Sequence, residues 1–310
     1  MAETDKAKSS AQESGSSTGS SVSAARSPKK TPMYQAQNAE RYLRQTRIKE
    51  IQAKSNSRLL CYVEGTGVQI TRDDILGFVE LLHNVPRGSN IDLLLHTVGG
   101  DINAAEKIVS MLRSAVGTQS RFRVIVPDFA KSAGTLIALA ADKILMSDSS
   151  ELGPIDPQFP KRDHDGTVRW HSVLNYLTAY EEICTKVRLD PTDIPANVML
   201  SKFDPTMLVQ FETVKRRARM LAEQHLNRWM FQKKKATYTK IAGDLMDIAR
   251  WPAHGQMIGY EDAKEMELEI EYLAPDTPEW QGYWDLYCQL RLAVKDGQKL
   301  FESDYASLPM

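Results

Sequence analysis

Short apolar segments alternate with helix-like segments over much of the chain after residue 58. Each apolar segment ends at a glycine, a proline or a polar residue, as strands do. The predicted strands are 59–63, 91–95, 122–126 and 143–146. Apolar residues recur at helical spacing between them, which predicts helices over 71–82, 104–116 and 134–141. Because several of these strands are apolar without alternation, they indicate a parallel sheet covered on both faces, an α/β fold.

The pattern changes after residue 147. A loop is predicted at 151–165, which holds three prolines. A helix is expected from Trp170 to about residue 187, and a longer helical stretch across 203–249 that breaks near Ala236. The remaining predicted elements are a short strand at 257–258, a helix over 260–266, a strand over 268–272 and an amphipathic C-terminal helix that follows Pro275 and Pro278.

These patterns divide the chain into four parts. Residues 1–33 hold too few large apolar side chains to offset the entropy of ordering and are predicted to be a disordered tail. Residues 34–57 form a weakly amphipathic helical arm, which either packs on a partner subunit or stays solvated. The α/β domain spans 58–274 and includes a helical section at about 170–250. Residues 275–310 are expected to form the C-terminal helix.

Composition places the chain among ordinary globular proteins. It has 310 residues, 42% hydrophobic and 25% charged, with a formal net charge of −1. That balance excludes a protein that is basic overall, so general attraction to nucleic acid or anionic membranes is not expected. No window approaches the ~18 consecutive apolar residues of a membrane span. Cys61, Cys184 and Cys288 are odd in number and far apart, which argues against a disulfide framework and suits a reducing, cytoplasmic location. They form no CxxC pair, which argues against structural zinc.

Two turns rich in small residues follow predicted strands, at the sheet edge where open α/β sheets bind ligands. The first contains Gly99 and Gly100 before a predicted helix. Paired glycines let backbone N–H groups approach a substrate closely, as an oxyanion hole requires. A phosphate site needs the same geometry, so the glycine pair alone does not distinguish the two. It is neither a GxGxxG nor a Walker sequence.

The second turn is Lys131–Gly134, directly before the helix predicted over 134–141. A serine at such a corner exposes its hydroxyl, and the N–H of Ala133 points the same way. Taken alone, Ser132 is more simply interpreted as a helix N-cap. Because the diglycine turn precedes it, we favour Ser132 as a nucleophile.

Four segments in order resemble the ClpP/crotonase superfamily. They are Leu94–Asp101 (LLHTVGGD), Lys131–Thr135 (KSAGT), Ala140–Ile144 (AADKI) and Ser150–Pro157 (SELGPIDP). Within the superfamily, the chain is most similar to the serine dehydrogenase proteinase family, relatives of signal peptide peptidase A. The resemblance covers residues 58–160 and, more weakly, 250–273. Val98 replaces the proline usual before the diglycine, which can alter the loop but leaves its N–H groups.

The resemblance implies a ClpP/crotonase-like fold of repeated ββα units with added helices. It also implies an ATP-independent serine peptidase acting on a peptide or protein. Ser132 would be the nucleophile, the N–H groups of Gly100 and Ala133 the oxyanion donors, and Gly99 the residue that shapes the turn. No metal or organic cofactor is implied. Superfamily members usually assemble, so a homo-oligomer is expected, and a monomeric mass in light scattering would count against it.

The general base stays open at this point. ClpP-type relatives use histidine with aspartate, but 152–157 contains no histidine where that residue would lie. Signal-peptide-peptidase relatives use a lysine, for which Lys186 is the alternative candidate. His254 lies between a proline and a glycine in the section that resembles the late part of the superfamily domain, and it is the preferred candidate base or orienter. His164 is interpreted as a solvated loop residue.

Three neighbouring residues are interpreted structurally. Lys131 is too close to Ser132 in sequence to act easily as its base. Asp156 could orient a base, but a role in forming its proline-rich turn is preferred. His96 follows an apolar strand and is interpreted as a hydrogen-bonded structural histidine.

Two other function classes remain. One is an inactive ClpP-like scaffold or a nucleic-acid adaptor, because the stretch over 203–249 is rich in lysine and arginine. A solvated helix face explains that stretch more simply, so a solvated face is preferred to nucleic acid as a partner. The other is crotonase-like chemistry on an acyl thioester, which would use the same oxyanion hole but needs no nucleophilic serine.

Overall fold

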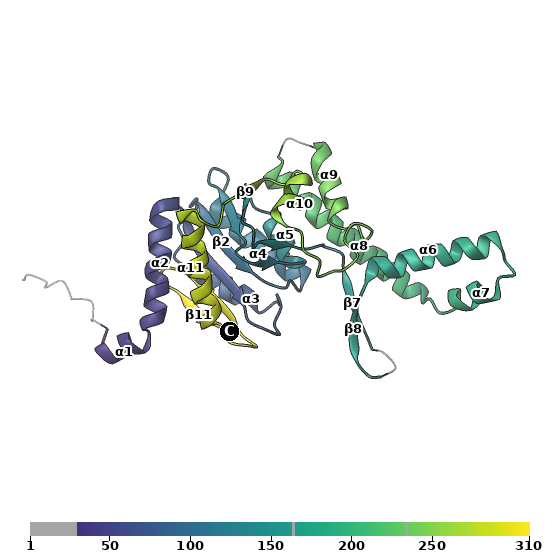
Figure 1. Ribbon diagram of the computed structural model, residues 1–310, viewed down its shortest axis with the longest axis horizontal. Helices are drawn as coiled ribbons and strands as arrows, with labels where there is room; N and C mark the ends of the chain where they lie inside the picture. Colours follow the sequence, from purple (N-terminus) through teal and green to yellow (C-terminus); the bar gives the residue numbers. More distant parts are fainter. Residues whose placement is uncertain (1–29, 163–164, 233–234) are drawn as a thin grey trace, which may run out of the picture. The chain divides into compact units, whose positions relative to one another are not determined.

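The computed structural model describes residues 30–162, 165–232 and 235–310 (Figure 1). The chain forms two units, residues 1–39 and 40–310. In the first, the short helix α1 (Pro32–Gln37) begins after Thr31, whose hydroxyl accepts the Tyr34 N–H at 3.4 Å. The predicted tail falls largely on residues 1–29, which lie outside the described residues. Among the described helices, none is long and apolar enough to cross a membrane.

A seven-stranded mixed sheet forms the centre of the second unit (Figure 1). Its order is β11-β10-β1-β2-β3-β5-β9. The parallel strands are β1 (Arg58–Glu64), β2 (Ile91–His96), β3 (Phe122–Ile125), β5 (Lys143–Met146) and β9 (Ile270–Tyr272). β10 (Lys299–Glu302) runs antiparallel to β1, and β11 (Ser307–Pro309) antiparallel to β10. The predicted α/β class and its four predicted N-terminal strands are confirmed.

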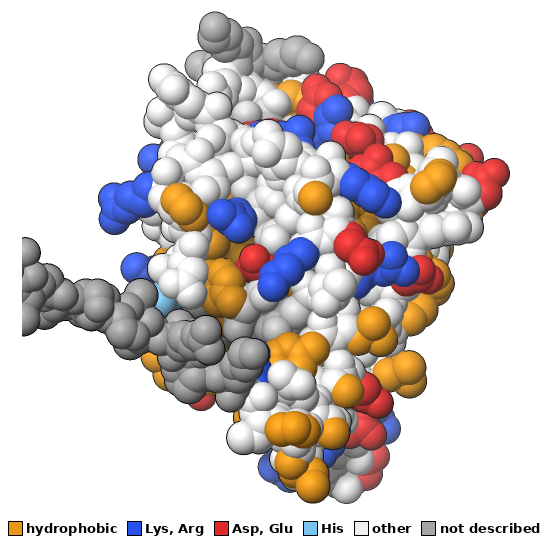
Figure 2. Space-filling view, turned by 90° about the vertical axis from the view of Figure 1, so that its left-hand side faces the viewer, with side chains coloured by type: hydrophobic (Ala, Val, Ile, Leu, Met, Phe, Trp, Pro, Cys, Tyr) orange, Lys and Arg blue, Asp and Glu red, His pale blue; other side chains and the backbone are white. Residues whose placement is uncertain are grey.

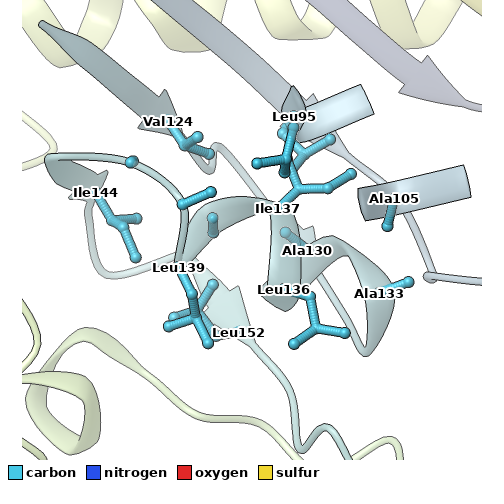
Figure 3. Packing of buried hydrophobic residues seen from close by; sticks show 14 of the residues in the cluster. Leu95, Ala105, Val124, Ala130, Ala133, Leu136, Ile137, Leu139, Ile144 and Leu152 are labelled. Carbon is cyan, nitrogen blue, oxygen red and sulfur yellow. The ribbon is translucent and has the colours of Figure 1, made fainter. Parts of the chain in front are cut away.

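Helices cover both faces of the sheet because successive strand residues point to opposite sides. On one side, strand residues pack with α3 (Asp74–Leu82), α4 (Ile102–Val116) and α5 (Ala133–Ala138). Figure 3 shows this core, with Leu95 and Val124 close to Ile137 of α5. On the other side, strand residues such as Leu59 and Val63 pack with α2 (Ala39–Ser55) and α11 (Pro278–Ala293).

The prediction of a C-terminal helix across residues 275–310 was wrong in extent. The helix α11 ends at Ala293, and the last residues form β10 and β11 beside β1. β10 carries Lys299 and Glu302, which are buried and charged. The Lys299 ammonium contacts Asp74 Oδ1 at 2.6 Å, and Glu302 accepts from Arg44 Nε at 2.8 Å. Distant partners neutralise both charges, so the local pattern does not indicate a buried strand.

The predicted loop at 151–165 is partly ordered into strands. β4 (Phe129–Ala130) pairs with β6 (Glu151–Leu152), while β7 (Gln158–Arg162) and β8 (Val168–Ser172) form an antiparallel hairpin. Most hairpin side chains are exposed, so these strands lack the apolar alternation that sequence interpretation needs. The helix expected from Trp170 begins at Val173 instead, after a Ser172 cap. His164 lies outside the described residues.

The helical section consists of several shorter helices. They are α6 (Val173–Leu189), α7 (Ile194–Leu200), α8 (Pro205–His225), the π-helical turn η1 (Leu226–Met230) and α9 (Lys235–Asp244). The helix expected over 260–266 is α10 (Tyr260–Glu265). Ile258 forms an isolated bridge with Leu152, where a strand was expected. On α8, Arg217 pairs with Glu106 and Arg219 with Glu223. Acidic and basic side chains are also interspersed on the face shown in Figure 2.

Candidate active site

One cavity of about 760 Å³ brings the two small-residue turns together. Gly100 from the diglycine turn and both Ser132 and Ala133 from the second turn line it. His254, which follows these turns by more than a hundred residues, lines the same cavity. The structure therefore places the predicted nucleophile, the predicted oxyanion donors and the preferred base around one space.

Ser132 has an unusual backbone conformation for a residue with a side chain. Its φ is 49° and its ψ −113°, in the turn between β4 and α5. The N–H of Gly134 donates to Lys131 O at 2.7 Å, which closes the turn tightly. Although Ser132 occupies the N-cap position of α5, its hydroxyl makes no capping hydrogen bond. Non-glycine residues with positive φ cost about 1–3 kcal/mol and concentrate at functional sites. The hydroxyl is consequently left available to the cavity.

The diglycine turn lies directly against the serine turn. A Cβ atom on Gly99 would lie 2.7 Å from Lys131 O and 2.8 Å from Ser132 Cβ, closer than a real side chain allows. Gly99 also has a φ of +100°, which favours glycine. The spacing between the two turns thus depends on glycine at this position.

The backbone N–H groups of the two turns differ in their hydrogen bonding. Those of Val98, Gly99 and Asp101 each donate to an oxygen of the protein. The N–H groups of Gly100 and Ala133 donate to no acceptor among the described residues. Both residues line the cavity. A developing oxyanion requires two such unused donors, and these two belong to residues that line one cavity.

His254 is paired with an acid. Its Nδ1 lies 2.6 Å from Oδ1 of Asp156, whose residue is only 3% exposed. The other carboxylate oxygen of Asp156 accepts from Gln158 Nε2 at 3.1 Å. A neutral imidazole that donates from Nδ1 to a carboxylate keeps the lone pair of Nε2 for a proton. Asp156, interpreted from the sequence as a turn residue, thus bonds to the candidate base.

The alternative base lies elsewhere. Lys186 is an exposed residue of α6 and is not among the described residues that line the cavity. Lys131 is next to Ser132 but directs its Nζ to Glu151 Oε2 at 2.5 Å and to Leu152 O at 3.1 Å. The Lys131 ammonium group is therefore engaged by Glu151 and by a backbone carbonyl, and no hydrogen bond joins it to Ser132 among the described residues.

We expect Lys186→Ala to leave the reactivity of Ser132 within about twofold of wild type, because its side chain is exposed and is not among the residues that line the cavity. The rate of covalent labelling of Ser132 measures this. A loss of tenfold or more would instead return Lys186 to consideration as the base.

His96 is a buried histidine outside the cavity. Burial, reinforced by the charge of Arg291, lowers the pKa of His96 to about 3, so its ring is neutral. Its Nδ1 lies 3.1 Å from Tyr287 Oη, and its ring packs on Phe129. These contacts fit the structural role that the sequence indicates.

The fold is α/β, and one of its cavities is lined by both Ser132 and His254. The family described as ClpP-like SDH-type serine proteinase matches residues 31–169, which include the diglycine turn and Ser132. The resemblance inferred from the sequence is thereby confirmed, and it supports a serine peptidase. His254 lies outside the matched segment, so the family match alone does not identify it.

Similar proteins include two uncharacterized proteins of Methanocaldococcus jannaschii. One is 28% identical over 239 residues, which cover 74% of this chain and 73% of the relative. The other is 39% identical over 89 residues, which cover 29% of this chain and 30% of the relative.

Two solved structures of variants of a membrane-bound stomatin-specific protease are also similar. One has a TM-score of 0.40 at 16% identity, and the matched part covers 66% of this chain and 75% of the solved chain. The other, in complex with a substrate peptide, has a TM-score of 0.32 at 14% identity. The matched part covers 71% of this chain and 93% of the solved chain.

Proposed function

We propose that this protein is a serine peptidase that uses Ser132 as nucleophile, His254 as general base and Asp156 as the residue that orients His254. The observation that carries the proposal is that Ser132, His254 and two backbone N–H groups without a described acceptor line one cavity. The 2.6 Å contact between His254 and Asp156 supports the role of base, because it directs Nε2 away from the acid.

In the first step, Ser132 Oγ forms a bond to the carbonyl carbon of the scissile peptide while His254 Nε2 takes the hydroxyl proton. The carbonyl π electrons move to oxygen, and the N–H groups of Gly100 and Ala133 donate to that oxyanion. When the oxyanion collapses, the C–N bond breaks and His254 returns its proton to the departing amine. The product is an ester between Ser132 and the acyl half of the substrate.

The second step repeats this chemistry with water. His254 takes a proton from the water as its oxygen attacks the ester carbonyl, and the same two N–H groups stabilise the second oxyanion. The ester C–O bond then breaks, Ser132 regains a proton from His254, and the carboxylic acid product leaves. No cofactor enters either step.

Labelling with a fluorophosphonate probe tests the proposal. An activated serine displaces fluoride from phosphorus, so we expect an adduct on the peptide that contains Ser132. Heat-denatured protein is the control and should stay unlabelled. Absence of an adduct in the native protein, on both sides of neutral pH, would contradict the proposal. It would favour an inactive scaffold, for which salt-dependent binding to DNA or RNA is the next measurement.

A further inference from the structure

A buried carboxyl group on β1 holds the loop that carries one oxyanion donor. Glu64 is 2% exposed, and its Oε2 accepts the Val98 N–H at 2.9 Å. The hydroxyl of Thr97 bonds to the same carboxyl group and accepts the Gly99 N–H at 3.0 Å. The two N–H groups that precede Gly100 are therefore fixed to Glu64, one directly and one through Thr97.

The other side of the loop is fixed by the backbone of a single residue. Ile70 donates its N–H to Gly99 O at 2.7 Å, and its carbonyl accepts the Asp101 N–H at 2.9 Å. Between these contacts, Gly100 presents the N–H that lacks a described acceptor. An oxyanion donor has to lie about 2.7–3.1 Å from the oxygen it stabilises. A small shift of the loop would consequently weaken that contact.

The contacts around Glu64 also determine where a proton lies. Tyr62 Oη is 2.8 Å from Glu64 Oε1 and 2.9 Å from Asp74 Oδ2. A phenol has one hydrogen, so it donates to one of these carboxyl groups and must accept from the other. Asp74 already accepts from the Lys299 ammonium at 2.6 Å and from the Thr71 N–H at 2.8 Å, so two other donors hold this carboxyl group. Glu64 is therefore the carboxyl group that carries a proton and donates it to Tyr62 Oη.

We propose that Glu64, in its protonated form, is a positioning residue that holds the diglycine loop so that the Gly100 N–H faces the oxyanion. The proposal rests on the function proposed above. Its basis is that Glu64 touches neither the cavity nor Ser132 among the described contacts, but fixes the N–H groups of Val98 and Gly99.

Ionisation of Glu64 would disturb this arrangement. Burial raises the pKa of Glu64 to about 7, against the lowering effects of its hydrogen bonds and of Lys299. The groups that face it are Tyr62, the Asp74–Lys299 pair and Arg291, whose guanidinium donates to the Glu64 backbone carbonyl at 2.7 Å. After proton loss, Tyr62 has one hydrogen for two carboxylates. Lys299 anchors Asp74, so Glu64 is the carboxylate that moves away from the other. The diglycine loop moves with Glu64 because the Val98 N–H is bonded to it.

The test measures the rate of fluorophosphonate labelling of Ser132 in the full chain, on both sides of neutral pH. Wild type should label more slowly at the alkaline end of this range, where Glu64 ionises. Glu64→Leu removes the acceptor for the Val98 N–H and should label about tenfold more slowly or worse. Glu64→Gln keeps a carbonyl oxygen for Val98 and an N–H for Tyr62. The labelling rate of Glu64→Gln should therefore return most of the way to that of wild type, and it should not decline at alkaline pH.

Glu302→Gln is the matched control. Glu302 is equally buried but lies on β10, where it bonds to Arg44 rather than to the loop. Its labelling profile should follow that of wild type.

Equal labelling of wild type and a folded Glu64→Leu variant would overturn the role of Glu64 while leaving the peptidase proposal intact. If the leucine variant does not fold, an unchanged alkaline decline in Glu64→Gln overturns the role on its own. Wild type that does not label at all overturns both proposals.

Discussion

Replacing Ser132 with alanine should abolish fluorophosphonate labelling and lower peptide hydrolysis by on the order of 10⁶-fold, as loss of the nucleophile does in serine proteases. The hydroxyl is the group that attacks, whereas binding and the oxyanion donors remain. The fold should tolerate the change because the hydroxyl makes no capping hydrogen bond to α5. Labelling and a thermal unfolding curve, recorded on the same sample, check both statements.

A glycine at the same position separates strain from chemistry. Ser132 and its alanine replacement share a φ of 49°, which a glycine adopts without steric cost. We therefore expect Ser132→Gly to be as inactive as Ser132→Ala but more stable to unfolding by about 1 kcal/mol. Denaturant unfolding measures the difference. A glycine variant less stable than the alanine variant would show that the turn is not strained.

Asp156→Asn should lower the labelling rate of Ser132 by about 10⁴-fold, the loss that follows when a triad aspartate becomes an amide. The carboxylate lies 2.6 Å from His254 Nδ1 and favours the tautomer with the proton on that nitrogen. An amide N–H in the same place favours the opposite tautomer, in which Nε2 carries the proton and cannot accept another. The shape of the side chain is unchanged, so the fold should persist.

Asp128→Asn is the matched control for this prediction. Asp128 also lies beside a histidine, with Oδ2 3.6 Å from His96 Nδ1, and it accepts from Tyr287 Oη at 2.7 Å. It does not line the cavity among the described residues. Its variant should therefore label within about twofold of wild type. Similar labelling by Asp156→Asn and wild type would remove the pair of His254 and Asp156 from the mechanism.

Pairing with distant segments decided the elements that the sequence missed. The hairpin of β7 and β8 is mostly exposed, so its residues carry no apolar alternation. β10 holds Lys299 and Glu302 inside the sheet, and their charges become tolerable only beside Asp74 and Arg44. Neither segment contains the local pattern by which a strand is identified.

The sequence by itself determined the parallel strands β1, β2, β3 and β5, because each is a short apolar run that must be buried whatever surrounds it. It also determined the two small-residue turns, because the glycine pair and Ser132 each follow a predicted strand and precede a predicted helix. Ser132 was predicted from its place in such a turn. These features depend on neighbours along the chain.

Only the tertiary structure decided how the base is built. His254 was a candidate on its proline and glycine neighbours. Asp156 meets it because Leu152 of β6 pairs with Ile258, which precedes α10, and the Leu152 N–H donates to Ile258 O at 2.9 Å. Glu64 likewise meets the diglycine loop only because β1 and β2 are adjacent. Such contacts join residues far apart in sequence, and packing rather than local pattern brings them together.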